Sequence, residues 1–170
     1  QQPPANNEEL TYLNVRFLRS ITGNLHRRQM SFNDEVRTVY GPVPSWDATI
    51  NVEENAQLGE SVVLMTCDRL NLAEVPGIDR ESRFVELEAV GNSVVEALLY
   101  TARAHRITYA QAKDALTLEG NSRNDAQLFL RQRVGGRWQE TEAKLIRYRP
   151  STGEVDIDAP SRLDILQVPQ

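Results

Sequence analysis

Apolar and polar residues alternate through much of the C-terminal half of the chain, with the period of two that is typical of half-buried β-strands. The clearest example occurs twice. Residues 104–110 (AHRITYA) and 116–121 (LTLEGN) align without a gap, at an offset of 39 residues, with 143–149 (AKLIRYR) and 155–159 (VDIDA). Each copy contains an Ile-x-Tyr triplet, a polar turn and an alternating run, so the sequence predicts the same β-hairpin twice.

A third, looser copy lies upstream. Residues 67–72 match the first arm of the hairpin and 85–92 match the second, with eight extra residues in the intervening turn. A Gly-Asn dipeptide closes two of the copies, at Gly91-Asn92 and Gly120-Asn121. Repetition of one unit indicates that neighbouring hairpins stack and bury a shared apolar face.

Residues 94–115 also have the composition of a helix. They contain no Gly or Pro, and Val95, Leu98, Leu99 and Ala102 follow helical spacing. However, 101–109 aligns with 140–148, which runs into Pro150 and is poor helix material. Because one repeated unit should have one structure, the sequence favours strands here.

The N-terminal part of the chain has a weaker pattern. Residues 1–25 are expected to be a lead-in, disordered over the Pro- and Asn-rich residues 1–9, with a strand or a short helix within 10–21. Residues 26–170 are expected to form the folded domain. Strand-like runs between Met30 and Tyr40 end at Gly41-Pro42.

Three further elements are predicted from short patterns. Residues 47–52 form a short strand, 126–148 a hairpin turning at Gly135-Gly136, and 161–168 a final strand. The residues expected to share one face of the first strand of that hairpin are Leu128, Leu130 and Val134.

The repeated motif, Ala-x-x-Ile-x-Tyr, a polar turn and Leu-x-Leu-x-Gly-Asn, resembles the OstA-like family of LptA-type periplasmic lipopolysaccharide-transport domains. The resemblance spans 66–166, extends to 30–43 and is absent from the first 25 residues. It implies an all-β fold, a curved open β-jellyroll built of stacked antiparallel hairpins, whose apolar inner groove holds lipid acyl chains.

The inward aliphatic and tyrosine residues of the three hairpins would line that groove. They are Leu70, Leu72, Leu87, Ile107, Tyr109, Leu116, Leu118, Ile146, Tyr148, Val155 and Ile157. In a closed fold the same residues would be ordinary core, and the sequence does not separate these alternatives.

The charge distribution adds a second candidate site. A net charge of −5 argues against general nucleic-acid binding. Residues 123–149, in contrast, hold seven basic and three acidic residues. Arginines suit lipid phosphates, although a solvated outer face is the favoured explanation. The proposed headgroup contacts are Arg131, Arg133, Arg147 and Arg149.

Catalytic patterns are missing from the sequence. His26 and His105 have no metal-ligand spacing, and Cys67 is expected to pack as a small apolar residue. The carboxylate pairs Glu86/Glu88 and Asp156/Asp158 each point to one strand face, which we assign to solvent. We therefore expect a protein that is not an enzyme and has no catalytic residue, metal or cofactor.

The resemblance places the protein in the periplasm or cell envelope, with lipopolysaccharide or another lipid as its partner. No run of about 18 apolar residues could span a membrane. The chain starts with Gln1-Gln2-Pro3-Pro4 and shows no export signal, as expected for a mature or excised form. The alternative is a structural or protein-interaction β domain of a larger envelope protein with a filled core.

An open sheet leaves edge strands that can pair with similar β domains, and family resemblance implies such edge-to-edge association. If residues 161–168 form that edge, Ile165→Pro should weaken association, because proline removes a backbone donor. Light scattering or partner pull-down measures the effect. Unchanged association would show that this edge is not the interface.

Overall fold

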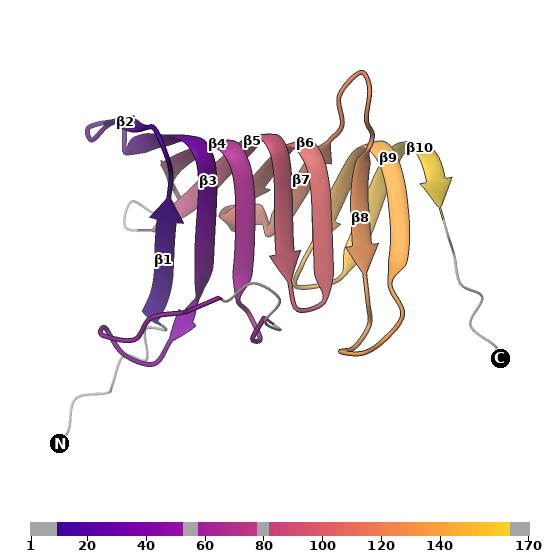
Figure 1. Cartoon of the computed structure of the whole chain (residues 1–170), viewed down its shortest axis with the longest axis horizontal. Coiled ribbons are helices and arrows are strands. Elements are labelled where there is room, and N and C mark those ends of the chain that lie inside the picture. Colours follow the sequence, from indigo (N-terminus) through magenta and orange to yellow (C-terminus); the bar gives the residue numbers. More distant parts are fainter. Residues whose placement is uncertain (1–9, 53–57, 78–81, 164–170) are drawn as a thin grey trace.

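The computed structural model describes residues 10–52, 58–77 and 82–163, which form one curved antiparallel sheet (Figure 1). Along the sheet the order is β1-β3-β4-β5-β6-β7-β9-β10, with β2 beside β3 and β8 between β6 and β9. The elements are β1 (Leu10–Arg16), β2 (Ser20–Asn24), β3 (Gln29–Val43), β4 (Val63–Pro76), β5 (Arg83–Ala97), β6 (Tyr100–Ala110), the 3₁₀-helix η1 (Gln111–Lys113), β7 (Ala115–Glu119), β8 (Ala126–Leu130), β9 (Gln139–Arg149) and β10 (Glu154–Leu163). The all-β prediction is confirmed.

The three predicted hairpins are β4–β5, β6–β7 and β9–β10. Equivalent repeat positions pair in the same way, Ile107 with Leu118 and Ile146 with Ile157. Residues 94–115 form strands and one short 3₁₀ turn, so the strand interpretation is correct. β6 pairs with β5 on one side and with β7 and β8 on the other, and these ladders outweigh local helix propensity.

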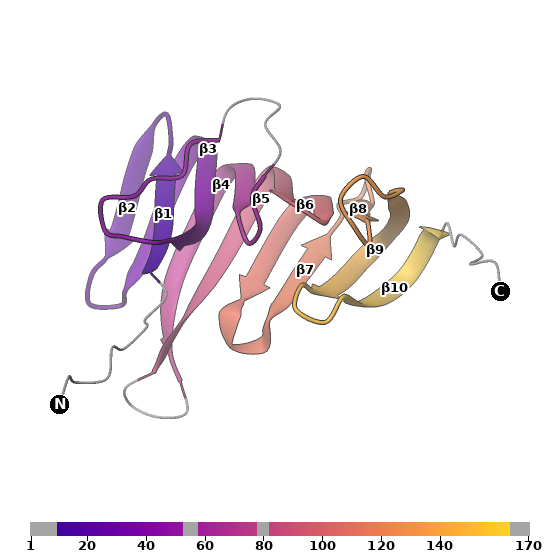
Figure 2. The same cartoon turned by 90° about the horizontal axis from the view of Figure 1, so that it is seen from below.

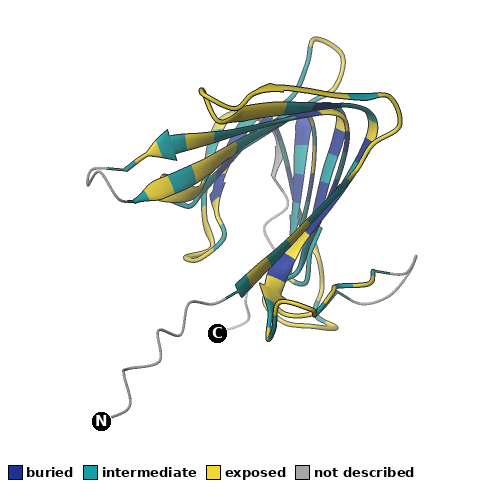
Figure 3. Cartoon of the chain, turned by 90° about the vertical axis from the view of Figure 1, so that its left-hand side faces the viewer, coloured by how far each residue is buried: buried dark blue, intermediate teal, exposed yellow. Residues whose placement is uncertain are grey.

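The long strands bend sharply where their pairing register shifts. The shifts fall between Asn33 and Val36, between Thr66 and Arg69, and between Val90 and Ser93. At the same level residues 120–125 separate β7 from β8, which pair with successive parts of β6 and β9. The sheet is thereby folded into two arms (Figure 3). The β1 arm contains β1 and β8, the β2 arm contains β2 and β7, and the other strands run through both.

The Gly-Asn dipeptides of the repeat lie at this bend between the two arms, which we call the corner. Gly91 and Asn92 both have positive φ angles, +80° and +45°, and the Asn92 amide donates to Asp68 Oδ2 at 3.1 Å. A Cβ on Gly120 would lie 2.5 Å from the carbonyl oxygen of Asn124. Because both positions exclude ordinary side chains, the recurring dipeptide marks the bend of the strands.

The core lies between the two arms, on the inner face of the sheet (Figure 3). Its fully buried large side chains include Leu70, Ile107, Leu118, Leu128 and Ile146. They come from both arms, so the fold buries one face of a single sheet against itself.

The N-terminal region differs from expectation. β1 and β2 both pair with β3, so the sheet begins at Leu10, within the segment expected to be a lead-in. Residues 1–9 lie outside the described residues. Of the strand and the short helix left open within 10–21, the strand is correct for β1, whereas β2 was not predicted. The alternation in 10–24 is weak because apolar residues such as Leu13 and Ile21 remain exposed.

Three local predictions were wrong. Residues 47–52 are not a strand, and the carbonyl of Val52 accepts from the Arg37 guanidinium instead of a ladder. β3 continues through Pro42, where β1 is its one ladder partner among the described strands. Val134 lies beyond β8 in an exposed loop.

The final predicted strand is only partly visible. Residues 161–163 continue β10, with a register shift between Pro160 and Arg162. Residues 164–168 lie outside the described part of the chain, so the edge containing Ile165 stays a prediction.

The corner generates a stability prediction. Gly91→Ala should lower the free energy of unfolding by about 2–4 kcal/mol, through positive-φ strain and a clash. The new Cβ would lie 2.2 Å from Asp68 Oδ2. Urea denaturation measures the loss.

Gly153→Ala is the matched control, since its φ is +72° but a Cβ there would meet nothing within 4 Å. It should cost about 1 kcal/mol. Equal losses would contradict a steric role for the Gly91–Asp68 approach.

Candidate functional site

Two parallel rows of apolar side chains cross the inner face of the β2 arm. The strand register defines the row farther from the corner as Met30, Leu72, Leu87, Tyr109, Leu116, Tyr148 and Val155. The row nearer the corner is Phe32, Leu70, Ala89, Ile107, Leu118, Ile146 and Ile157. All eleven groove candidates from the sequence lie in these rows.

The candidates differ in burial. Six belong to the buried core: Leu70, Ile107, Leu116, Leu118, Ile146 and Tyr148. The other five pack against that core but are partly exposed: Leu72, Leu87, Tyr109, Val155 and Ile157. In this conformation the middle of the inner face is therefore packed, with its apolar margin accessible.

Tyrosines join the two arms across this space. Tyr100 of the β1 arm meets Tyr148 of the β2 arm edge-on, with ring centroids 5.2 Å apart. Burial raises the pKa of the Tyr100 and Tyr148 hydroxyls. Burial and the neighbouring Asp114 raise the pKa of Tyr109 to about 12, and its hydroxyl lies 3.4 Å from an Asp114 oxygen. These rings close the inner face between β6 and β9.

The inner face is more open at its N-terminal end. Leu13 and Tyr40 pair across β1 and β3 and are 52% and 44% exposed, and Val15, two residues from Leu13, packs on the core. Ile21 and Met30 are 50% and 40% exposed. The sequence pattern did not indicate Leu13 and Ile21, because their segment was placed outside the domain.

The four headgroup candidates are not brought together. Arg131 and Arg133 lie in the loop before β9, whereas Arg147 and Arg149 lie at its far end. Arg147 pairs with Asp156 and Asp158 at 3.2 and 3.1 Å, and Arg149 pairs with Glu154.

Arg131 is also engaged. It donates to the Leu98 carbonyl at 2.8 Å and lies over the ring of Trp138, 4.5 Å from its centroid. Arg133 is exposed and has no acidic partner among the described contacts. Of the four candidates, only Arg133 could bind a phosphate without losing one of the described contacts.

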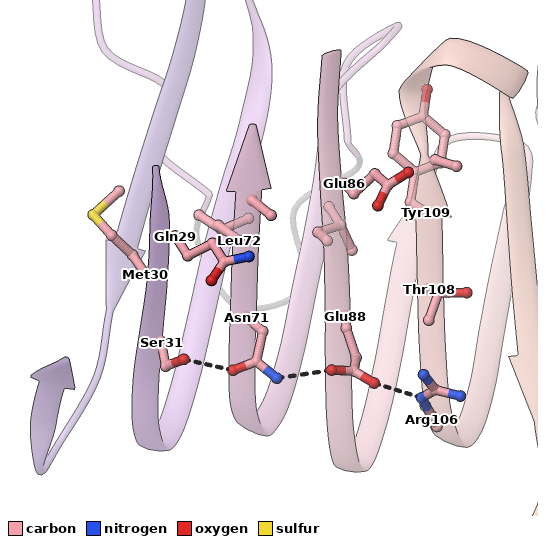
Figure 4. A pocket seen from close by; sticks show the side chains of 13 residues that line it. Gln29, Met30, Ser31, Asn71, Leu72, Glu86, Glu88, Arg106, Thr108 and Tyr109 are labelled. Atoms are coloured by element: carbon pink, nitrogen blue, oxygen red, sulfur yellow. Dashed lines mark hydrogen bonds and ion pairs between the residues drawn. The ribbon is translucent and has the colours of Figure 1, made fainter. Parts of the chain in front are cut away.

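A polar ladder crosses the outer face of the β2 arm (Figure 4). Ser31 donates to Asn71 at 2.7 Å, Asn71 donates to Glu88 at 2.8 Å, and Arg106 donates to Glu88 at 2.6 Å. Arg106 also reaches Glu119, so the ladder connects five strands. It lies in a hollow of about 530 Å³. Because its members already bond one another, we assign the ladder a structural role.

The candidate chemistry residues have simple environments. His105 is exposed, and Cys67 is buried, with the pKa of its thiol raised by burial to about 11. Within residues 10–52, 58–77 and 82–163, no three His, Cys, Asp or Glu side chains gather as metal ligands would. The same residues contain no helix of the length and apolarity needed to cross a membrane.

Comparisons with known proteins locate the fold. No family model matches the chain, and no curated protein matches its sequence. Among solved structures it is similar to LptH of Pseudomonas aeruginosa, the LptA-homologous periplasmic component of a lipopolysaccharide transport device. The TM-score is 0.60 at 12% identity, over 93% of this chain and 96% of that chain. At this identity the likeness shows a shared β-jellyroll fold.

The polar ladder generates a pH prediction. Hydrogen bonding from Asn71, followed by contact with Arg106, lowers the pKa of Glu88 in the folded state. A lowered folded-state pKa stabilises the fold above the unfolded value, about 4.3, and this stabilisation is lost as pH falls further. Glu88→Gln should therefore reduce the free energy of unfolding by about 1 kcal/mol or less at pH 7. Its difference from the unsubstituted protein should shrink below about pH 4.

Glu86→Gln is the control, since Glu86 shares the strand and face of Glu88 but has no hydrogen-bonded partner among the described contacts. Urea denaturation between pH 3 and 7 compares the two variants. The ladder assignment fails if both behave alike.

Proposed function

We propose that this chain is a non-enzymatic lipid-handling module of the periplasm or cell envelope. It holds the acyl chains of lipopolysaccharide or a similar amphiphile between the two arms of the sheet. The observation that carries the proposal is the apolar inner face, which runs in register from β3 to β10 of a sheet whose described strands do not close into a barrel. The shared fold with a lipopolysaccharide-transport component supports it.

The chemistry of this face suits acyl chains and little else. Its two rows contain aliphatic and aromatic residues that belong to the buried core or pack against it. A hydrocarbon chain gains roughly 0.8 kcal/mol for each CH₂ group removed from water, so a chain of about twelve carbons gains roughly 10 kcal/mol. That gain is large enough to offset local opening of packed side chains.

Binding in the middle of the sheet requires the two arms to separate. The contact between Tyr100 and Tyr148 and the buried side chains near the corner occupy the space that an acyl chain would need. The exposed inner residues near β1 to β3 need no such displacement. We therefore expect first contact at Met30 and Tyr40, followed by movement toward β9 as the arms part.

The four arginines remain proposed contacts for headgroup phosphates. Arg133 is accessible as it stands, whereas Arg147 and Arg149 would exchange carboxylate partners for phosphate. Such an exchange preserves charge pairing, because guanidinium binds both groups through two parallel hydrogen bonds.

The second candidate is a structural or protein-interaction domain with a permanently filled core. The observation that favours it is the complete burial of Leu70, Ile107, Leu118 and Ile146. Among the described strands, β1 and β10 each have one ladder partner. In either function these edges could pair with similar β domains, and we propose such association for the module.

The lipid proposal predicts face-specific capture. A photo-crosslinking residue at Met30 or Leu87, on the inner face, should capture lipopolysaccharide or phospholipid from envelope extracts. The matched neighbours Gln29 and Glu86 point to the outer face and should capture at least about tenfold less, since apolar chains gain nothing there. Mass spectrometry of the adducts measures capture.

Met30 should react more strongly than Leu87, because it is already 40% exposed. Absence of lipid adducts at both inner positions, with the fold intact, would favour the filled-core domain. Equal capture at inner and outer positions would mean that the amphiphile binds without regard to the groove.

A further inference from the structure

The N-terminal edge of the sheet is basic, although the chain as a whole is acidic. Residues 10–33 contain no Asp or Glu, but they include Arg16, Arg19, His26, Arg27 and Arg28. All five lie between the end of β1 and the start of β3. We call residues 16–28 the β2 edge.

The β2 edge also exposes large apolar side chains. Leu25 is 86% exposed and Leu18 is 68% exposed, and Phe17 and Ile21 add partly exposed surface. Among the described residues, seven of the twelve exposed large hydrophobics fall between Leu13 and Tyr40. Single exposed leucines are ordinary, but a cluster of them beside arginines indicates an interaction surface.

The turn that presents Leu25 is held in place. The Arg28 amide donates to the Leu25 carbonyl at 3.3 Å, and the Arg27 amide donates to the Asn24 side chain at 2.9 Å. The β1–β2 loop is fixed in a similar way, since the Leu18 amide donates to the Asp34 carbonyl at 2.8 Å. Both leucines therefore project from ordered turns.

Part of the positive charge is neutralised from the sheet side. Arg19 pairs with Asp34 of β3 at 3.5 Å, and Arg28 pairs with Glu74 of β4 at 2.7 Å. Arg16 and Arg27 have no acidic partner among the described contacts. These two acidic partners thus lie on β3 and β4, on the sheet side of β2. The side of β2 that faces away from the sheet keeps its positive charge.

The position of β2 makes this surface available. Among the described strands β2 has β3 as its one partner, and it lies at the outermost edge of the sheet (Figure 2). Leu18 and Leu25 flank this five-residue strand, and both are largely exposed. A protein partner would need two matching pockets, whereas a bilayer accepts projecting leucines into its interface and supplies phosphates for the arginines.

We propose that the β2 edge docks on an anionic phospholipid membrane surface. Leu18 and Leu25 enter the headgroup region, and Arg16 and Arg27 bind lipid phosphates. All Asp and Glu residues lie outside residues 10–33, so an anionic surface favours contact through the β2 edge. Docking brings the exposed inner residues Ile21 and Met30 close to the bilayer, but it does not require that the groove hold lipid.

Flotation with lipid vesicles tests the docking directly. The full chain should float with phosphatidylcholine vesicles that contain phosphatidylglycerol and not with pure phosphatidylcholine vesicles. Binding should weaken from 0.1 to 0.5 M salt, because salt screens exposed charges. The double variant Leu25→Asp/Arg27→Glu should reduce the bound fraction at least about tenfold.

Val134→Asp/Arg137→Glu is the matched control, since it makes the same charge change and removes an exposed apolar residue from a loop beside β9. It should retain binding within about twofold. In addition, Leu25→Trp should shift its fluorescence to the blue with anionic vesicles, whereas Val134→Trp should not.

Three results would overturn the proposal: no flotation with anionic vesicles, equal losses in both double variants, or full binding by Leu25→Asp/Arg27→Glu. Far-ultraviolet circular dichroism checks that each variant keeps its β structure. Normal crosslinking at Met30 in a variant that does not float would separate membrane docking from lipid capture in the groove.

Discussion

The fold depends on the bend that turns one sheet back on itself. A single sheet with one apolar face must cover that face with something else, and here each long strand covers it with its own other half. The bulges and positive-φ residues at Asp34, Gly91 and Asn92 make this possible, because a regular ladder would continue flat. Core burial and the two arms both follow from this corner.

The inner face combines a packed centre with an accessible N-terminal end. Tightly packed side chains give stability but no room for a guest, and exposed ones give room at the cost of stability. Inner-face residues are buried in the middle of the sheet, as at Ile107, and exposed at its N-terminal end, as at Ile21. Stability and room for a ligand are therefore provided by different parts of the sheet. A ligand can therefore begin to bind without first disrupting the residues that hold the domain together.

Much of the fold could be predicted from the repeat, since the Ile-x-Tyr hairpins have the same register in every copy. The corner could not be placed, because the sequence shows Gly91-Asn92 but not the Asp68 contact that needs glycine. β1 was left open between strand and short helix and β2 was not predicted, because exposed residues such as Leu13 and Ile21 blur the alternation. The stretch around them contains no Asp or Glu, but residues 123–149 contain more basic residues and therefore gave the stronger sequence signal. Three of the four arginine candidates there already have partners in the structure.

The equivalence of the three hairpins has a consequence for how such a chain can change its size. Each hairpin pairs with the next through the same row positions, Leu87 with Tyr109 and Leu116 with Tyr148, so a copy inserted between two others would meet the contacts that it requires. One hairpin contributes two strands, or about 9–10 Å of length across the sheet. Gene duplication could thus lengthen this molecule in fixed increments while leaving both of its ends, and whatever each end recognises, unaltered.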